Sequence, residues 1–286
     1  MLFRSRAAEA RAKGEKPKGR KPAPPVTPGH MTRGHVGNLY ERYIRSAVGY
    51  GIRGVLWDQG ESGTAIHGVD QYSVMSALIA GWRREWGQGE FPFIYVQKPS
   101  GGGPALDPKS SITREADAYQ PPPANVPNVA DGSRRLEFIR IMDNPNAHMV
   151  SAADLGSGVH PINKWGYGNR AAQVALSKVY GKDLLAHGPR YKSHTIEGNR
   201  IEIRFSEVGK GLTTAQGKPL TGFAIAGVDQ KFVRAEAVIV GDSVVVSSEA
   251  VAKPVAVRFA CSKKRNWANL FNKDGLPALA FRTDDW

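Results

Sequence analysis

The sequence predicts an α/β domain with a mostly parallel sheet, followed by an all-β domain. With 286 residues, 41% of them hydrophobic, the chain can form one large core or two modest ones. From residue 39 to about 180, strand-like runs alternate with helix-like apolar periods, which is typical of βα units. Beyond residue 188, short alternating runs separated by turn residues predict a β-sandwich of about 100 residues.

A basic segment precedes both domains. The formal net charge is +13. Residues 1–22 carry eight Lys/Arg against two Glu, and the Pro-rich residues 22–28 favour extended backbone. We therefore expect a disordered arm over residues 1–30, the α/β domain over 31–187 and the β-sandwich over 188–286.

Several classes of protein are excluded by the sequence. It has no run of 18 apolar residues, and no apolar stretch follows the N-terminal charges, so we expect neither a membrane span nor a signal peptide. The single cysteine, Cys261, cannot form an internal disulfide, and no Cys/His spacing fits a zinc site. We expect no metal and no specific nucleic-acid partner; a polyanion-binding role through the arm is a minor hypothesis.

The first βα units place a polar loop after a strand. A short helix is expected over residues 39–48 and a buried strand over 52–57, followed by the turn-prone loop 58–63. Asp70 is a candidate N-cap for a helix that ends near Gly87, and residues 91–96 form the next strand.

The second half of the α/β region repeats this arrangement. Residues 98–131 lack an apolar period and are expected to form a long loop at the rim of a substrate site. A helix at 134–142, a strand at 148–152 and a polar loop at 154–161 follow. One more helix then has apolar residues on one side. The strands predicted for the β-sandwich are 200–205, 220–226, 235–240, 244–246 and 255–259.

Two residues in these loops have the chemistry of a catalytic dyad. Ligands bind beyond the carboxyl ends of the strands in open α/β sheets, where Glu61 and His160 are expected to converge. A histidine can accept a hydroxyl proton, while a carboxylate behind it fixes the tautomer and stabilises the imidazolium. The spacing alone is also consistent with Glu61 and His160 as ordinary solvated loop residues.

Several blocks of sequence resemble one family. Residues 51–62 read GIRGVLWDQGES, which is similar to the IRG-VLWYQGES stretch of sialate O-acetylesterase-like enzymes. Further blocks resemble that family in the same order. They are residues 82–97, the DLG at 154–156 with HP at 160–161 and NK at 163–164, and the closing NLFN, GLP and FRTDDW blocks. The resemblance extends over about residues 39–286.

The resemblance implies the C-terminal part of a serine esterase with the three-layer SGNH-hydrolase fold, which removes O-acetyl groups from carbohydrates without a cofactor. It implies His160 as the base and Glu61 as its supporting carboxylate, with Asp154 as the alternative carboxylate. Gln59 and Ser62 would contact the acyl oxygen or the sugar; a role in shaping the loop is about equally well supported. It also implies a periplasmic or extracellular full-length form.

The chain departs from the family pattern at two places in this loop. Asp58 stands where Tyr or His is common, and Gly63 stands where Asn is common. Without the Asn side chain, position 63 could hold an oxyanion only through its backbone N–H.

No nucleophile is identified. The family's serine lies in a G-[QD]-S-N segment upstream of the QGES block, and residues 1–50 contain no counterpart. The Gly241-Asp242-Ser243 sequence is better explained as a hairpin turn. We therefore expect this chain alone to be inactive, as a truncated, split or degenerate esterase, with a complementing N-terminal half as a partner. The alternative is a non-catalytic carbohydrate-binding remnant.

Overall fold

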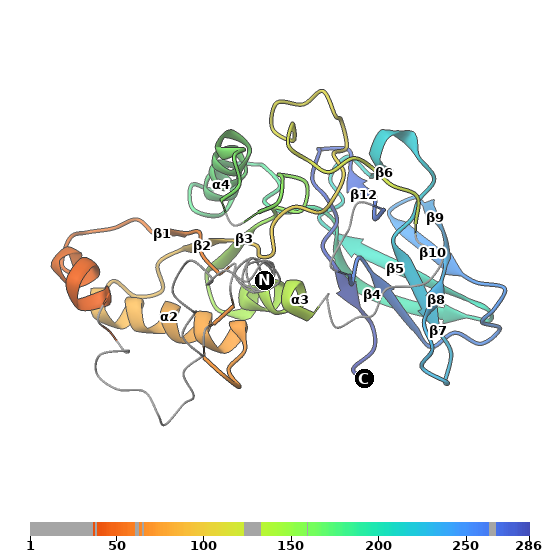
Figure 1. Cartoon of the computed structure of the whole chain (residues 1–286), viewed down its shortest axis with the longest axis horizontal. Coiled ribbons are helices and arrows are strands. Elements are labelled where there is room, and N and C mark those ends of the chain that lie inside the picture. The colour runs from red at the N-terminus through yellow and green to blue at the C-terminus, as the bar shows by residue number, and fades with distance from the viewer. Residues whose placement is uncertain are drawn as a thin grey trace, which may run out of the picture.

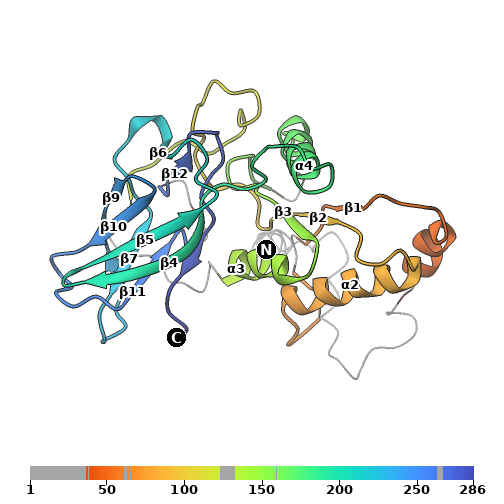
Figure 2. The ribbon, with the colours of Figure 1, turned by 180° about the vertical axis from the view of Figure 1, so that it is seen from behind.

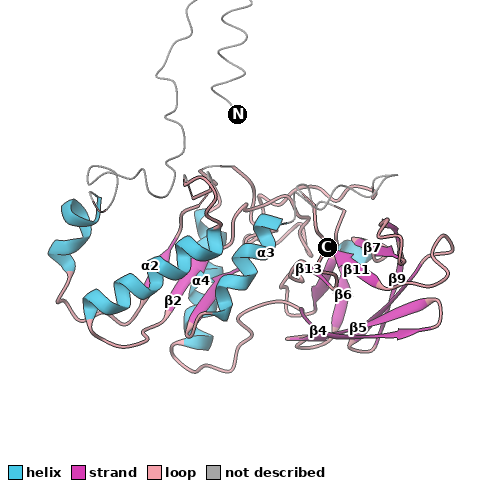
Figure 3. Ribbon diagram, turned by 90° about the horizontal axis from the view of Figure 1, so that it is seen from below, coloured by secondary structure: helices cyan, strands magenta, loops and turns pink. Residues whose placement is uncertain are grey.

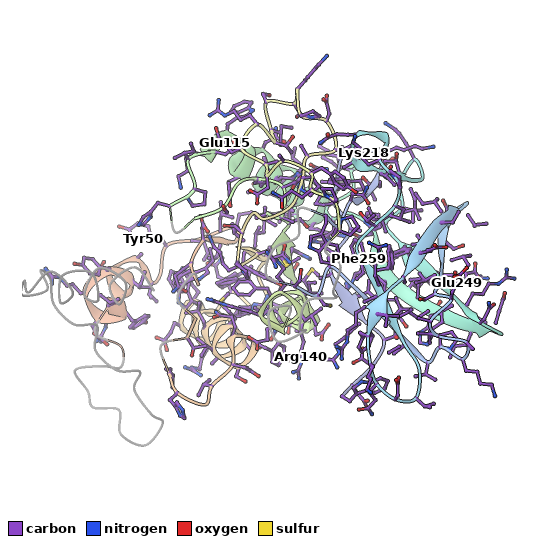
Figure 4. The ribbon with its side chains drawn as sticks, turned by 45° about the vertical axis from the view of Figure 1, so that its right-hand side comes forward. Tyr50, Glu115, Arg140, Lys218, Glu249 and Phe259 are labelled. Carbon is purple, nitrogen blue, oxygen red and sulfur yellow. The ribbon has the colours of Figure 1, made fainter. Side chains whose placement is uncertain are left out.

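The computed structural model describes residues 37, 39–60, 63–64, 66–122, 133–158, 160–262 and 267–286. The arm predicted for residues 1–30 lies outside the described residues. Within those ranges no helix is both long and apolar enough to cross a membrane. A helical part with a parallel sheet lies beside a part made of antiparallel strands (Figure 1). Figure 4 shows Tyr50 at the helical end and Glu249 on the far side of the antiparallel part.

The predicted parallel sheet is confirmed. Strands β1 (Val55–Trp57), β2 (Phe93–Val96) and β3 (Ala147–Val150) form a sheet in the order β1-β2-β3. Both pairs are parallel, with Leu56 opposite Ile94 and Ile94 opposite His148. The carboxyl ends of all three strands therefore meet at one edge of the sheet.

The helices begin and end near the residues that the sequence indicates. Helix α2 is Gln71–Trp86; the Asp70 side chain accepts a hydrogen bond from the Ser73 N–H at its start, and Gly87 ends it in the left-handed conformation, with φ 63°. Asp at the start and Gly at the end are common helix caps. The Asp side chain accepts a hydrogen bond from an N–H that has no partner within the helix, and glycine tolerates positive φ. Three further helical elements follow in this part, namely α3 (Ser133–Arg140), the 3-10 turn η4 (Ile141–Asp143) and α4 (Lys164–Lys178), and a 3-10 turn η5 (Ala215–Gly217) lies among the antiparallel strands.

The short helix predicted over residues 39–48 occurs as two consecutive helical turns and not as a regular α-helix. A π-helical turn η1 (Tyr40–Ile44) is followed by the 3-10 turn η2 (Arg45–Ala47), and neither buries a residue. Leu39 and Tyr43 are exposed. The apolar side chains of this segment have no core to pack against among the described residues. Packing therefore does not stabilise a regular α-helix there.

The two faces of the sheet carry different helices. Helices α2 and α3 lie on one face, where Met75, Ile79, Phe93 and Phe138 share a core. Helix α4 lies on the other, packing Tyr167, Ala171 and Val174 against Ile94 and Val150. Figure 1 and the reverse view in Figure 2 both show α4 on the side of the sheet opposite α2 and α3.

The antiparallel part contains two four-stranded sheets and a two-stranded one. Their orders are β4-β5-β10-β9, β13-β11-β7-β8 and β12-β6. The strands are β4 (Arg190–Glu197), β5 (Arg200–Ser206), β6 (Leu212–Thr214), β7 (Phe223–Ala226), β8 (Val233–Arg234), β9 (Glu236–Val240), β10 (Ser243–Ser247), β11 (Ala256–Phe259), β12 (Leu270–Asn272) and β13 (Phe281–Arg282). All five predicted strands occur, whereas β4, β6, β8, β12 and β13 were not predicted. A β-sandwich remains our interpretation of this part.

One hydrophobic core is shared by the two larger antiparallel sheets. Ile203 and Val244 from one sheet and Ile225 and Phe259 from the other belong to the same buried cluster. The hairpin predicted around Gly241 is confirmed: β9 and β10 pair antiparallel with Ser243 opposite Val240, and the Ser243 hydroxyl donates to the Val240 carbonyl.

Helix α3 joins the two parts of the molecule, which Figure 3 shows as a helical end and a strand-rich end. Phe138 packs in the core under the parallel sheet, while Leu136 packs against the antiparallel core. The buried Arg135 guanidinium donates to the Ser262 carbonyl on the antiparallel side and to the Gly101 carbonyl in the loop after β2. The helix therefore fixes that loop relative to both parts.

Candidate functional site

The loops that follow the three parallel strands contact one another. The Gly101 N–H, after β2, donates to the Ala152 carbonyl, after β3, at 2.7 Å. The Lys98 ammonium forms an ion pair with Asp58, after β1, at 2.8 Å. The loop after β2 therefore contacts both of its neighbours at the carboxyl edge of the sheet. The convergence expected for Glu61 and His160 stays a prediction.

Gly60 anchors the first loop against the helices below it. Its φ is 126°, and a Cβ there would lie 3.0 Å from the Phe138 ring, so only glycine fits. The Arg134 guanidinium donates to the Gly60 carbonyl. Gln59, the residue before it, is exposed and thus available to a ligand, whereas Glu61 and Ser62 lie outside the described residues.

Gly63 forms a turn with Gly60. Its backbone N–H donates to the Gly60 carbonyl at 3.3 Å, with a φ of 79°. This N–H is therefore already used, and in this conformation it does not serve as an oxyanion donor. The departure from Asn at this position removes a side-chain donor that the backbone does not replace.

A polar pocket of about 290 Å³ opens beside this loop. Gly63, Thr64, Asp70, Arg134 and Glu137 are among its lining residues. Hydrogen bonds from Ser73 lower the pKa of Asp70, so its carboxylate is ionised across the neutral range. The Arg134 cation and these carboxylates give the pocket donors and acceptors, as binding of a polar molecule requires.

Asp154 is committed to a buried ion pair. Both of its carboxylate oxygens accept hydrogen bonds from Arg170 on α4, at 3.2 and 2.8 Å, and both side chains are buried. A bidentate pair of this kind is strong and geometrically specific. Arg170 engages both oxygens of Asp154, which makes Asp154 the less available carboxylate for a histidine. The roles of Glu61 and Asp154 stay predictions.

His160 lies exposed at the end of the third loop. Buried Pro161 follows it, and Asn163 then caps α4 by accepting from the Gly166 N–H at 3.0 Å. The Asn163 amide also donates to the Ile112 carbonyl, which ties this loop to the expected rim. The backbone around His160 is therefore fixed on its C-terminal side, while the ring faces solvent.

The sequence analysis missed Lys98, which is the most buried charge in the site. Its side chain has no exposed area; besides its ion pair with Asp58, its ammonium lies 5.9 Å from the centre of the Tyr167 ring. The departure at Asp58 is thereby explained, because a carboxylate at 58 neutralises the lysine at 98. The signal was a lysine placed two residues after the apolar strand that ends at Val96.

Arg170 was missed as well. It stands three residues after Tyr167 and four before Val174, on the apolar face of α4. An arginine on such a face signals a buried ionic partner, because an unpaired buried charge is costly.

Comparisons with known proteins agree with the resemblance seen in the sequence. Residues 29–165 match the family described as carbohydrate esterase, sialic acid-specific acetylesterase. The chain is also similar to the crystal structure of a carbohydrate acetylesterase from Xanthomonas citri, with 32% identity and a TM-score of 0.68. That similarity covers 83% of this chain and 51% of the other, so the chain spans about half the length of that enzyme. Among curated proteins none matches.

The resemblance to sialate O-acetylesterase-like carbohydrate esterases that the sequence indicates is therefore confirmed by both comparisons. The mixed α/β architecture with a parallel sheet is likewise as expected. The SGNH assignment of the sheet and the β-sandwich assignment of the antiparallel part stay predictions.

Proposed function

We propose that this chain carries the base-bearing part of a carbohydrate O-acetylesterase. The observation that carries the proposal is the contact among the three loops at the carboxyl edge of the sheet, in a chain related to carbohydrate esterases. The substrate class is an O-acetylated sugar, and the reaction is acyl transfer to a serine followed by hydrolysis.

His160 takes the proton of the serine hydroxyl as that oxygen attacks the acetyl carbonyl, and then returns a proton to the leaving sugar oxygen. Glu61 fixes the imidazole and stabilises its protonated form. Water then attacks the acyl-serine ester while His160 takes its proton; His160 returns that proton to the serine oxygen as the ester bond breaks, which releases acetate and restores the serine hydroxyl. The serine is supplied from outside residues 1–286.

The dyad can be tested without the nucleophile by following the ring N–H resonance of His160 in NMR. A hydrogen bond from the ring N–H to a carboxylate moves that resonance downfield, so Glu61→Gln should shift it upfield. Glu90→Gln, at the opposite edge of the sheet, is the matched control and should leave it unchanged. A shift caused by Asp154→Asn instead would transfer the role to Asp154. No shift in either variant would contradict the dyad.

Activity gives the second test. The chain alone should show no hydrolysis of an aryl acetate above buffer, because base and carboxylate cannot form an acyl-enzyme without a serine. Turnover that a serine-directed phosphonate blocks would place the nucleophile inside the chain. Binding of an O-acetylated sugar without hydrolysis, even in the presence of a serine-bearing partner, would favour the carbohydrate-binding alternative.

A further inference from the structure

A pocket of about 330 Å³ lies where the loop after β2 meets the antiparallel part, and we call it the η5 pocket. Figures 1 and 2 both show this loop between α4 and β6. The pocket shares no lining residue with the one beside Gly63. Its lining residues are Gln216, from the turn η5, and Ala105, Pro108, Thr113, Arg114, Ala116, Asp117, Ala118 and Tyr119, from the loop.

Gln216 joins the antiparallel part to the loop. Its backbone N–H donates to the Leu106 carbonyl at 3.2 Å, and its side-chain amide donates to the Ala105 carbonyl at 3.4 Å. Its φ is 55°, in the left-handed region that glycine adopts at lower cost. A glutamine in this conformation points to a use for the side chain beyond forming the turn. The amide oxygen is an acceptor at the exposed wall of the pocket.

The opposite wall is held by hydrogen bonds within the loop. The Thr113 hydroxyl donates to the Asp107 carbonyl at 3.2 Å, and the Asp117 N–H donates to the Gly103 carbonyl at 3.1 Å. The side chains of Asp117 and Tyr119 are half-buried in this wall. The groups that a ligand would meet are therefore carried by backbone that is already ordered, which lowers the cost of binding.

The chemistry of the lining residues matches a neutral sugar. The Tyr119 ring offers an apolar face for the C–H groups of a sugar ring, while Gln216, Asp117 and Arg114 offer donors and acceptors for its hydroxyl groups. The two charged lining residues, Arg114 and Asp117, have opposite signs. The lining therefore carries no net charge, which favours a neutral sugar over an anionic one.

The segment that forms the pocket packs against the loop that contains His160. The Asn163 amide donates to the Ile112 carbonyl at 2.7 Å, and a Cβ on Gly156 would lie 2.9 Å from the Glu115 side chain. His160 and Asn163 are three residues apart, and three residues span at most about 11 Å of chain. A short oligosaccharide with one sugar beside His160 can therefore extend towards the pocket.

We propose that the η5 pocket binds a neutral sugar residue that neighbours the acetylated residue in an oligosaccharide. Tyr119 packs against the face of this sugar, and Gln216 and Asp117 hydrogen bond to its hydroxyl groups. The proposal rests on the proposed function, because it extends the substrate from one acetylated sugar to an acetylated oligosaccharide. The antiparallel part then has a role in substrate selection, since it supplies one wall of the pocket.

The probes are O-acetylated trisaccharides of glucose, mannose and xylose, and the corresponding O-acetylated monosaccharides. Each is titrated into the full chain and its affinity is measured by NMR. We expect at least one trisaccharide to bind about tenfold more tightly than its own monosaccharide, because it fills the η5 pocket as well. Equal affinities for every trisaccharide and its monosaccharide would overturn the proposal.

Variants locate the added affinity. Tyr119→Ala and Gln216→Ala should each reduce trisaccharide affinity to near that of the monosaccharide, and should leave monosaccharide affinity unchanged. Tyr180→Ala, at an exposed tyrosine after α4, and Gln230→Ala, at an exposed glutamine with a φ of 60°, are the matched controls and should change neither affinity. Pocket variants that leave trisaccharide affinity unchanged would overturn the proposal.

A third variant separates loss of binding from loss of folding. Gln216→Gly removes the amide, while glycine adopts the positive φ more readily. It should lose the trisaccharide preference without a lower midpoint of thermal unfolding. Retention of the full preference in Gln216→Gly would exclude the Gln216 side chain as a sugar contact and overturn the proposal.

Two further arms test the class of sugar and the link to the proposed function. Tighter binding of O-acetylated trigalacturonate than of every neutral trisaccharide would overturn the assignment of a neutral sugar. Trisaccharide binding that requires Tyr119 but not the acetyl group would support the η5 pocket and count against the proposed function. Binding of acetylated monosaccharides, with no gain from further sugar residues, would do the reverse.

Discussion

At the residue scale, His148 on β3 is a histidine held neutral. Its ring is half-buried, and one ring nitrogen lies 3.0 Å from the Asn146 amide oxygen. Burial, followed by the positive charges of His187, Lys178 and Arg83, lowers the pKa of His148 to about 4. The ring stands before the middle of the strand, away from the carboxyl edge, so this shift concerns stability rather than the proposed chemistry.

The pKa of His148 predicts a pH dependence of stability. The folded protein binds the proton less well than the unfolded chain, whose histidine titrates near 6.5. The free energy of unfolding is therefore fully maintained above about pH 6.5 and falls as the pH drops towards 4. We expect a loss of about 1–2 kcal/mol after allowance for solvent screening of a half-buried ring. Urea unfolding between pH 4 and 7 measures it, and His148→Gln should flatten the curve. An equal slope in both proteins would contradict the assignment.

Asp284 closes the C-terminal motif. It is the common partner of Arg258 and Arg282, and both arginines also donate to the carbonyl of Trp286. Burial tends to raise the pKa of Asp284, but the hydrogen bonds and charges of the two arginines outweigh it and lower the pKa. The FRTDDW block therefore has a structural role in attaching the chain end to β11.

Asp284→Asn should destabilise the folded protein by about 3 kcal/mol, since it leaves the buried Arg258 without its counter-charge. Because the folded pKa is depressed, this contribution is present above the ordinary aspartate range and disappears as the pH falls through the folded value. Denaturant titration at pH 7 measures this change in the free energy of unfolding. Asp285→Asn, the exposed neighbour, is the control and should change stability by less than about 0.5 kcal/mol. Equal effects would contradict a specific role for Asp284.

At the scale of elements, the loops after β2 and β3 fit together through glycines. A Cβ on Gly101 would overlap the backbone of Gly156 and Ser157, and Gly101 has a φ of 70°. Gly156 in turn has a φ of 91°, and a Cβ on it would lie 2.9 Å from the Glu115 side chain. The spacing of the candidate site therefore depends on backbone that approaches too closely for any side chain.

Gly101→Ala should lower the free energy of unfolding by roughly 2–4 kcal/mol, through the strained φ and the overlap with the neighbouring loop. Gly81→Ala, in the middle of α2, should have the opposite effect. Gly81 has an ordinary φ, and no atom lies within 4 Å of the added methyl group, so the substitution should raise the free energy of unfolding by about 0.5–1 kcal/mol. Thermal or urea unfolding of the pair measures both. A neutral Gly101→Ala would mean that the two loops can separate without cost.

Patterns of local sequence predict the elements that have strong local signals. Asp70 and Gly87 bound α2 as their chemistry requires, and the alternating run before Gly241 gives a strand and a hairpin. The unpredicted strands are of two kinds. Short β8 and β13 exist only through pairing with β7 and β11, and short β6 and β12 pair with each other. The longer β4 has several polar and exposed residues, and its partner β5 supplies the apolar side. The local pattern of apolar and polar residues does not show which distant strands will pair.

The candidate site was predictable to a similar degree. Strand ends placed the loops containing Gln59, Asp154 and His160 at one edge, and the loop contacts agree with that placement. The ion pairs of Lys98 with Asp58 and of Arg170 with Asp154 depend on which loop meets which helix, so the sequence alone could not pair them. Asp154 shows the consequence. The family resemblance made it the alternative carboxylate of the dyad, yet Arg170 donates hydrogen bonds to both of its oxygens.

At the scale of the whole molecule, the two parts are held together by α3 and by the last residues of the chain. Leu279 belongs to the core under the parallel sheet, although β12 and β13 on either side of it pair with antiparallel strands. The Arg170 guanidinium also reaches across to the Gly275 carbonyl at 3.3 Å. We therefore expect the two parts to unfold in a single cooperative transition rather than one after the other.

The basic arm should be dispensable for that transition. Residues 1–28 have no apolar period with which to offset the entropy of ordering, so their deletion should leave the midpoint and cooperativity of thermal unfolding unchanged. The same deletion removes most of the concentrated positive charge. The deletion should therefore weaken binding to heparin at low salt relative to the full chain, whose binding should fall steeply as salt increases. Calorimetry and a salt series of heparin retention measure the two effects. Loss of the cooperative transition on deletion would show that the arm is a docked element of the fold and that its boundary lies elsewhere than near Pro28.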